Sequence, residues 1–144
     1  MGTWYYDGNM GLVKSAKKAA KIYKRAVELG NVNAMVVLGY AYEHGDGVKL
    51  DARKANQLYK MAADLGHAMA QTNLGNNNAR AGNWAAAISY FKSAASQGFI
   101  NAFFGLGICF ENCEGGLDEA KRWYARAAAK GHEDARADLE RLSR

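Results

Sequence analysis

The sequence contains no proline, only two cysteines and no long apolar run. Because proline breaks helix interiors, 144 residues with 16 glycines and no proline favour helices separated by glycine turns. No apolar run reaches the roughly 18 residues of a membrane-spanning helix, so no membrane association is expected. The first residues lack the basic and apolar segments of a secretion signal. These absences favour an intracellular location, and nothing in the sequence names the compartment.

Few residues have the spacing of an active site. Cys109 and Cys113 lie four apart on one expected helix face, where a disulfide is awkward and a metal would lack its other ligands. No nucleophile or carboxylate is spaced to form a triad with His44. The glycines of segment 45–47 follow no strand, so they indicate a turn and not a phosphate loop. We therefore expect no enzyme, catalytic residue, metal or cofactor, with a hydrolase as the least favoured alternative.

The net charge of +5 and the pI of about 9.2 raise the question of a nucleic-acid partner. Most of the excess is local, however, and a basic helix face is usually a solvated face. We do not expect nucleic-acid binding, although RNA remains an alternative that rests on this segment alone. The basic residues concerned are Lys14, Lys17, Lys18, Lys21, Lys24 and Arg25.

One phrase occurs four times along the chain. It begins with an aromatic residue, continues with alanines and ends in glycine, at Gly30, Gly66, Gly98 and Gly131. The glycines are separated by 36, 32 and 33 residues, which is the period of a helix-pair repeat. A second phrase, Leu-Gly, precedes the last three copies at matching offsets. Its members are Leu38-Gly39, Leu74-Gly75 and Leu106-Gly107.

These landmarks predict an all-α fold, an α-α superhelix (solenoid) of about four helix-pair repeats in a single domain over residues 1–144. The first repeat is expected to be truncated, because only a short aromatic segment remains of its leading helix. A final amphipathic segment is expected to form a C-terminal capping helix. The repeats are expected at about residues 1–30, 31–66, 67–98 and 99–131, and the capping helix at 132–144.

Several small residues have expected structural roles within each repeat. A glycine in mid-helix costs up to about 1 kcal/mol, so Gly39 and its equivalents are expected where two helices approach closely. Gly66 is expected to end its helix in the left-handed conformation. Asp51 and Asn83 are expected to cap the helices that follow them.

The second copy resembles the Sel-1-like repeat, a relative of the tetratricopeptide repeat. The resemblance covers nearly the whole chain, although the third copy, GNWAAAISYF, is closer to a tetratricopeptide repeat. It implies an adaptor whose concave side, lined by the first helix of each pair, holds partner proteins or peptides, and it implies no active site. The matching residues are Ala34, Leu38, Gly39, Tyr42, Gly45, Gly47, Val48, Asp51, Lys54, Ala55, Tyr59, Lys60, Ala62, Ala63 and Gly66.

The motif leaves one face of each first helix free, and that face carries the expected partner-binding residues. Large apolar groups outside the core need an explanation, and aromatic residues dominate binding hot spots. Asparagine amides offer both a donor and an acceptor to a peptide backbone. The alternative is that these groups pack between neighbouring helices. The candidates are Trp4, Asn33, Val36, Tyr40, Glu43, Thr72, Asn76, Asn101, Phe104 and Ile108.

The leading hypothesis is therefore a protein–protein interaction scaffold that binds a protein or peptide in this groove. No small-molecule substrate is expected. A structural segment of a longer solenoid, or self-association through the truncated first repeat, is the alternative of a different class. The sequence does not identify the partner.

Overall fold

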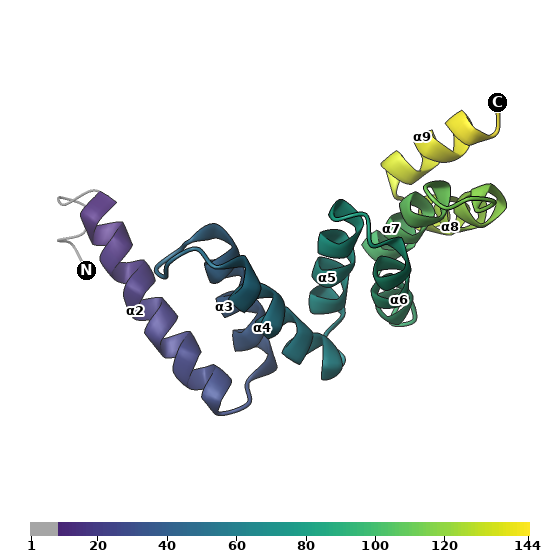
Figure 1. The fold of residues 1–144 in the computed structure, drawn as a ribbon. Coiled ribbons are helices and arrows are strands. Elements are labelled where there is room, and N and C mark those ends of the chain that lie inside the picture. The colour runs from purple at the N-terminus through teal and green to yellow at the C-terminus, as the bar shows by residue number, and fades with distance from the viewer. Residues whose placement is uncertain (1–8) are drawn as a thin grey trace. The chain divides into compact units, whose positions relative to one another are not determined.

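The computed structural model describes residues 9–144, and every regular element in that range is an α-helix. The all-helical prediction is confirmed for this part of the chain (Figure 1). Trp4 and the rest of the expected leading segment of the first repeat lie outside the described residues. The helices are α2 (Asn9–Glu28), α3 (Val32–His44), α4 (Ala52–Asp64), α5 (Ala68–Arg80), α6 (Trp84–Ala95), α7 (Ile100–Glu111), α8 (Leu117–Ala129) and α9 (Glu133–Leu142).

The helices form two compact units, which are described separately. Unit 1 extends to Gly66 and contains α2, α3 and α4, with α3 packed against both of the others. Unit 2, His67–Arg144, contains α5 to α9, each packed against the next, and α5 also contacts α7. The predicted helix pairs are therefore present as α3–α4, α5–α6 and α7–α8.

Each helix pair is held by an aromatic ring that lies on a glycine. A Cβ atom on Gly39 would lie 2.8 Å from the Tyr59 ring, and one on Gly75 would lie 2.7 Å from the Phe91 ring. Gly107 likewise lies directly against the Tyr124 ring. The three rings are at most 1% exposed. The expectation that these glycines mark close helix approaches is confirmed.

Most helix ends follow the expected capping chemistry. The Asp51 side chain accepts a hydrogen bond from the Lys54 amide at 3.1 Å, as predicted. Gly66 ends α4 with a φ of +90°, in the left-handed region where glycine has no steric penalty. Asn83 lies at the predicted start of α6, but its side chain makes no capping hydrogen bond, so that prediction was wrong.

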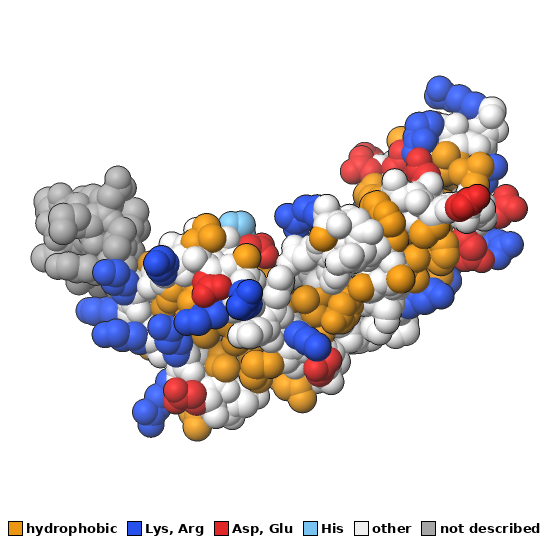
Figure 2. Space-filling view, viewed as in Figure 1, with side chains coloured by type: hydrophobic (Ala, Val, Ile, Leu, Met, Phe, Trp, Pro, Cys, Tyr) orange, Lys and Arg blue, Asp and Glu red, His pale blue; other side chains and the backbone are white. Residues whose placement is uncertain are grey.

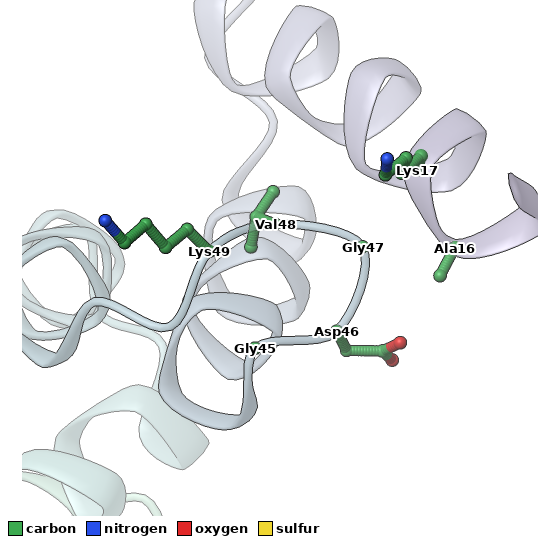
Figure 3. A pocket seen from close by; sticks show the side chains of 7 residues that line it. All are labelled: Ala16, Lys17, Gly45, Asp46, Gly47, Val48 and Lys49. Atoms are coloured by element: carbon green, nitrogen blue, oxygen red, sulfur yellow. The ribbon is translucent and has the colours of Figure 1, made fainter. Parts of the chain in front are cut away.

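A loop glycine fixes the contact between α2 and the turn that joins α3 to α4. Gly47 has a φ of +76°, and a Cβ atom there would overlap the Ala16 carbonyl of α2. Figure 3 shows Gly47 at the part of the loop nearest α2, while the Lys49 side chain extends away from that helix. A recess of about 360 Å³ lies between this loop and Ala16 and Lys17. The second glycine of the repeat motif therefore serves packing within unit 1.

The C-terminal helix closes unit 2 in the way the sequence predicts. Ala135 of α9 is fully buried, and Leu139 and Leu142 pack against the core of unit 2. The Arg141 guanidinium also donates hydrogen bonds to both oxygens of Glu111 on α7, each at 2.8 Å. The capping helix is thus held by an apolar stripe and by a charged contact.

Candidate partner-binding cleft

Unit 2 contains a cleft of about 550 Å³ between the first helices of its two repeats. One wall comes from α5 and the other from α7, with the residue that precedes α9 at one side. Five of the ten residues predicted to bind a partner line it. These are Thr72, Asn76, Asn101, Phe104 and Ile108.

The two walls have the same helical register. The α5 wall presents Met69, Thr72, Asn73 and Asn76, at positions i, i+3, i+4 and i+7. The α7 wall repeats these offsets with Asn101, Phe104, Gly105 and Ile108. Residues at these offsets share one helix face, so each wall is a single stripe along its helix. The repeat therefore builds the cleft from equivalent positions.

Aromatic rings support the α7 wall of the cleft. The Phe104 ring stacks on the His132 imidazole with their centroids 4.4 Å apart, and it lies 5.7 Å from the Tyr124 ring. His132 is held in place because its Nδ1 accepts a hydrogen bond of 3.1 Å from the Ala135 amide at the start of α9. Phe104 is thereby fixed on two sides and remains half-buried.

The lining of the cleft contains no Lys, Arg, Asp or Glu among its ten residues. Asn76 and Asn101 are exposed and lie on opposite walls. Thr72 is only 6% exposed, and its hydroxyl donates to the Ala68 carbonyl of its own helix at 2.9 Å. The amides of Asn76 and Asn101 are therefore better placed than Thr72 to hydrogen-bond a bound molecule.

The candidates in unit 1 all lie on α3 and differ in exposure. Tyr40 is 56% exposed, and its ring lies 4.1 Å from that of His44. Asn33 is exposed in the first turn of the helix. Val36, by contrast, is only 8% exposed, so it belongs to the core and has little surface to offer a partner. Tyr40 is the side chain of this helix that best fits an anchor.

Glu43 has a packing role that its position in the sequence did not suggest. Its carboxylate hydrogen-bonds the Tyr59 hydroxyl of α4, and burial together with this negative charge raises the pKa of Tyr59. Unit 2 has the equivalent pair, in which the Tyr124 hydroxyl donates to Glu111 at 2.8 Å. Burial and Glu111 raise the pKa of Tyr124 in the same way.

A signal for this role is present in the sequence. The pair α5–α6 has Ala79 where the pairs α3–α4 and α7–α8 have glutamate, and Phe91 where those pairs have tyrosine. The carboxylate and the hydroxyl are therefore lost together. This joint change indicates a contact between the two positions, and a partner-binding role does not account for it.

Five lining residues of the cleft were not among the predicted ones: Met69, Asn73, Phe99, Gly105 and His132. Met69 and Asn73 lie one helical turn from Thr72 and Asn76, so the register alone identifies them. Phe99 and His132 precede helices α7 and α9, and only the packing of those helix ends brings them to the cleft. Both also line a neighbouring recess of about 490 Å³.

The described residues contain no group of three or more His, Cys, Asp or Glu side chains arranged to hold a metal. Within the same range, no helix is long and apolar enough to cross a membrane.

The fold is shared with solved repeat proteins. A Sel1 repeat protein from Oxalobacter formigenes is 28% identical and superposes over 86% of this chain with a TM-score of 0.78. A protective antigen of uropathogenic Escherichia coli with an SLR fold is 24% identical over 86% of this chain, with a TM-score of 0.76. The chain spans 52% and 28% of the lengths of these two proteins. The predicted helical solenoid is thus confirmed. Curated proteins gave no significant match.

The sequence profile of the Sel1 repeat matches four segments that together cover most of the chain: residues 1–31, 32–67, 85–99 and 103–132. The third match is the shortest, in agreement with the departure of the third copy from the motif. Sel1 repeats commonly form protein–protein interaction scaffolds and are generally non-catalytic. The repeated helix pairs, the ring-on-glycine contacts and these matches together establish that the chain belongs to the Sel1 repeat family.

Proposed function

We propose that the chain is a protein-interaction module and that the cleft between α5 and α7 binds a short segment of a partner protein. The observation that carries this proposal is the convergence of Asn76, Asn101, Phe104 and Ile108 on one cleft of about 550 Å³. Cavities of this size with apolar walls and a few polar groups are typical binding sites.

The chemistry of the lining supports an extended segment with an apolar side chain. Phe104 and Ile108 provide an apolar surface, and the stacked His132 ring fixes the position of Phe104. The amides of Asn76 and Asn101, on opposite walls, can each donate to and accept from a peptide backbone. Because the lining has no Lys, Arg, Asp or Glu, a segment that places a charge against Phe104 would lose hydration without gaining an ion pair.

The test uses a random dodecapeptide display library panned on the full chain, followed by affinity measurements on synthetic copies of the enriched peptides. We expect peptides with a common apolar residue and dissociation constants in the micromolar range. Phe104→Ala should lower the affinity of these peptides at least about tenfold, as truncation of an interface aromatic often does. Asn76→Ala should weaken them less.

Tyr90→Ala is the matched control, since it removes an aromatic ring from α6 outside the cleft lining. Equal affinities for the wild type and Phe104→Ala, with both proteins folded by circular dichroism, would exclude the cleft. Self-association, the alternative from the sequence, stays a prediction that sedimentation velocity tests.

A further inference from the structure

Helix α2 carries the whole net charge of the protein. Six of the 19 Lys and Arg residues and one of the 14 Asp and Glu residues belong to this helix. Removing them leaves 13 basic and 13 acidic residues, which balance. The excess of five positive charges is therefore a property of one helix, and this is independent of the cleft in unit 2.

The basic residues form a single strip on that helix. Lys17, Lys18, Lys21, Lys24 and Arg25 are all exposed and follow each other at offsets of one and three, which places them on one face. The opposite face contains the buried Ala20 and packs against α3. Among the described residues, none of the five forms an ion pair. Figure 2 shows the gathering of Lys and Arg side chains over α2.

Two aliphatic side chains lie along one edge of the strip. Ile22 is 68% exposed, and Leu29, which directly follows the helix, is 80% exposed. They are seven residues apart, so they lie on the same side, about 10 Å from each other along the helix axis. Large aliphatic groups this exposed beside a cationic strip form a surface that is both basic and apolar.

The combination of basic and aliphatic side chains on this face favours one class of anionic partner over the others. A nucleic-acid backbone would pair with the lysines but would leave Ile22 and Leu29 in water. It would also find no exposed aromatic ring on the described part of this face for base stacking, since Tyr23 is half-buried. A membrane surface favours helices with a broad apolar face, and here the broad apolar face packs against α3. An acidic helix with an aliphatic edge satisfies both features.

The recess beside the loop does not add to this surface. It is lined by Lys17 and Lys49 but also by Asp46, so its charges partly cancel. The acidic residue of α2 itself, Glu28, lies at the end of the strip. The attractive region therefore runs along the outer face from Lys17 to Arg25 and is bordered by the two aliphatic residues.

We propose that this face of α2 is a docking surface for an acidic amphipathic helix of a partner protein. Carboxylates at helical spacing would pair with the strip, and aliphatic residues of the partner would pack on Ile22 and Leu29. The surface is separate from the cleft in unit 2, and the proposal does not depend on peptide binding there.

The probe is a fluorescein-labelled peptide of about four helical turns, with glutamate on one face and leucine along its edge. Lys18→Glu/Lys21→Glu should weaken its binding to the full chain at least about tenfold, with a steep dependence on salt. Ile22→Ser/Leu29→Ser should weaken it severalfold and leave the salt dependence unchanged. The matched control, Arg53→Glu/Lys60→Glu, makes the same change in net charge at exposed sites of α4.

Equal losses in both charge-reversal variants would overturn the proposal, because net charge alone would then explain binding. Equal binding of a scrambled peptide of the same composition would also overturn it. So would stronger binding of single-stranded RNA or of phosphatidylserine vesicles to the same strip. Peptides that bind the cleft should still bind the charge-reversal variants. This control distinguishes a failure of the docking surface on α2 from a failure of the proposed peptide binding in the cleft.

Discussion

The two units use the same glutamate–tyrosine pair but give it a different third partner. In unit 1 the Glu43 carboxylate hydrogen-bonds Tyr59 and lies 3.4 Å from the imidazole of His44, its neighbour on the same helix. In unit 2 the equivalent Glu111 accepts from Tyr124 and also from Arg141, which comes from a helix 30 residues further along. The pair joins two helices in unit 1 and three in unit 2.

The difference shows how a repeat motif acquires a local role. The contact within the helix pair is part of each unit, whereas the contact with α9 exists only where a closing helix is present. In unit 2 the same pair therefore holds one more helix, α9, than it does in unit 1. Unit 1 instead presents its charged helix, α2, to solvent.

The contact common to both units gives the largest expected effect. Gly107→Ala in unit 2 and Gly39→Ala in unit 1 would each force a Cβ atom into a buried tyrosine ring. Each should lower the free energy of unfolding by about 3 kcal/mol, the upper end for overpacking of a core. Chemical denaturation followed by circular dichroism measures it.

Gln57→Ala, at an exposed position of α4 near Tyr59, is the control and should change stability by less than about 0.5 kcal/mol. If only one of the two glycine substitutions is costly, the two units do not share this packing.

The loop of unit 1 gives the next effect. Gly47 and Gly30 both have a positive φ, but only Gly47 would place a Cβ atom against the backbone of α2. Gly30→Ala should lower the free energy of unfolding by about 1 kcal/mol, because alanine is strained in the left-handed conformation. Gly47→Ala should cost about twice that amount. Thermal unfolding measures both variants. Equal losses of stability in Gly30→Ala and Gly47→Ala would mean that the loop does not hold α2.

The charged contact of α9 gives a smaller, pH-dependent effect. The hydrogen bonds from Arg141, and then from Tyr124, lower the pKa of Glu111. A lowered folded-state pKa stabilises the protein above the unfolded pKa of about 4.3, and this gain is lost as the pH falls through the folded-state pKa. Glu111→Gln should therefore lower stability by about 1 kcal/mol at neutral pH and by less in acid.

Denaturation curves at several pH values between neutral and about 3 measure this dependence. Glu114→Gln, at an exposed site of the following turn, is the control for the change in net charge. If the free energy of unfolding of Glu111→Gln differs from that of the wild type by the same amount at every pH, the charged contact between Glu111 and Arg141 is not the source of the stability.

The smallest perturbation distinguishes the two units without destabilising either. Both cysteines lie in unit 2, and burial raises the pKa of Cys109 to about 11. In a Cys113→Ser variant, the Cys109 thiol should react with a thiol reagent only when unit 2 opens. The reaction rate gives the free energy of opening of unit 2. If residues 1–144 form the predicted single domain, this value should equal the free energy of global unfolding measured by circular dichroism. A lower value would show that unit 2 opens separately.

The parts of the fold that local chemistry decides were predictable from the sequence. Gly39, Gly75 and Gly107 each directly follow a leucine. A glycine repeated in mid-helix is typical of a close helix approach. Asp51 and Gly66 follow from the chemistry of helix ends. These positions need no knowledge of how the repeats pack on one another.

Other roles depend on side-chain directions that the register does not specify. Val36 occupies a position that the register assigns to the free face, but in the folded chain it is buried. His132 reaches the cleft only because α9 begins beside α7. Residues 76–78 of α5 are all asparagine, which has low helix propensity, and the Asn78 amide makes a local contact by donating to the Leu74 carbonyl at 2.8 Å. Such contacts become visible only in the folded chain.

The position of His132 also makes the cleft observable. Its Nδ1 accepts the Ala135 amide hydrogen, which in the neutral ring leaves the proton on Nε2, and its ring stacks on Phe104 inside the binding region. A molecule that binds in the cleft therefore changes the magnetic environment of this imidazole, which lies in the ring current of Phe104. The Nε2 and ring-proton resonances of one histidine are therefore a natural NMR reporter of occupancy, and a screen for ligands needs no attached label.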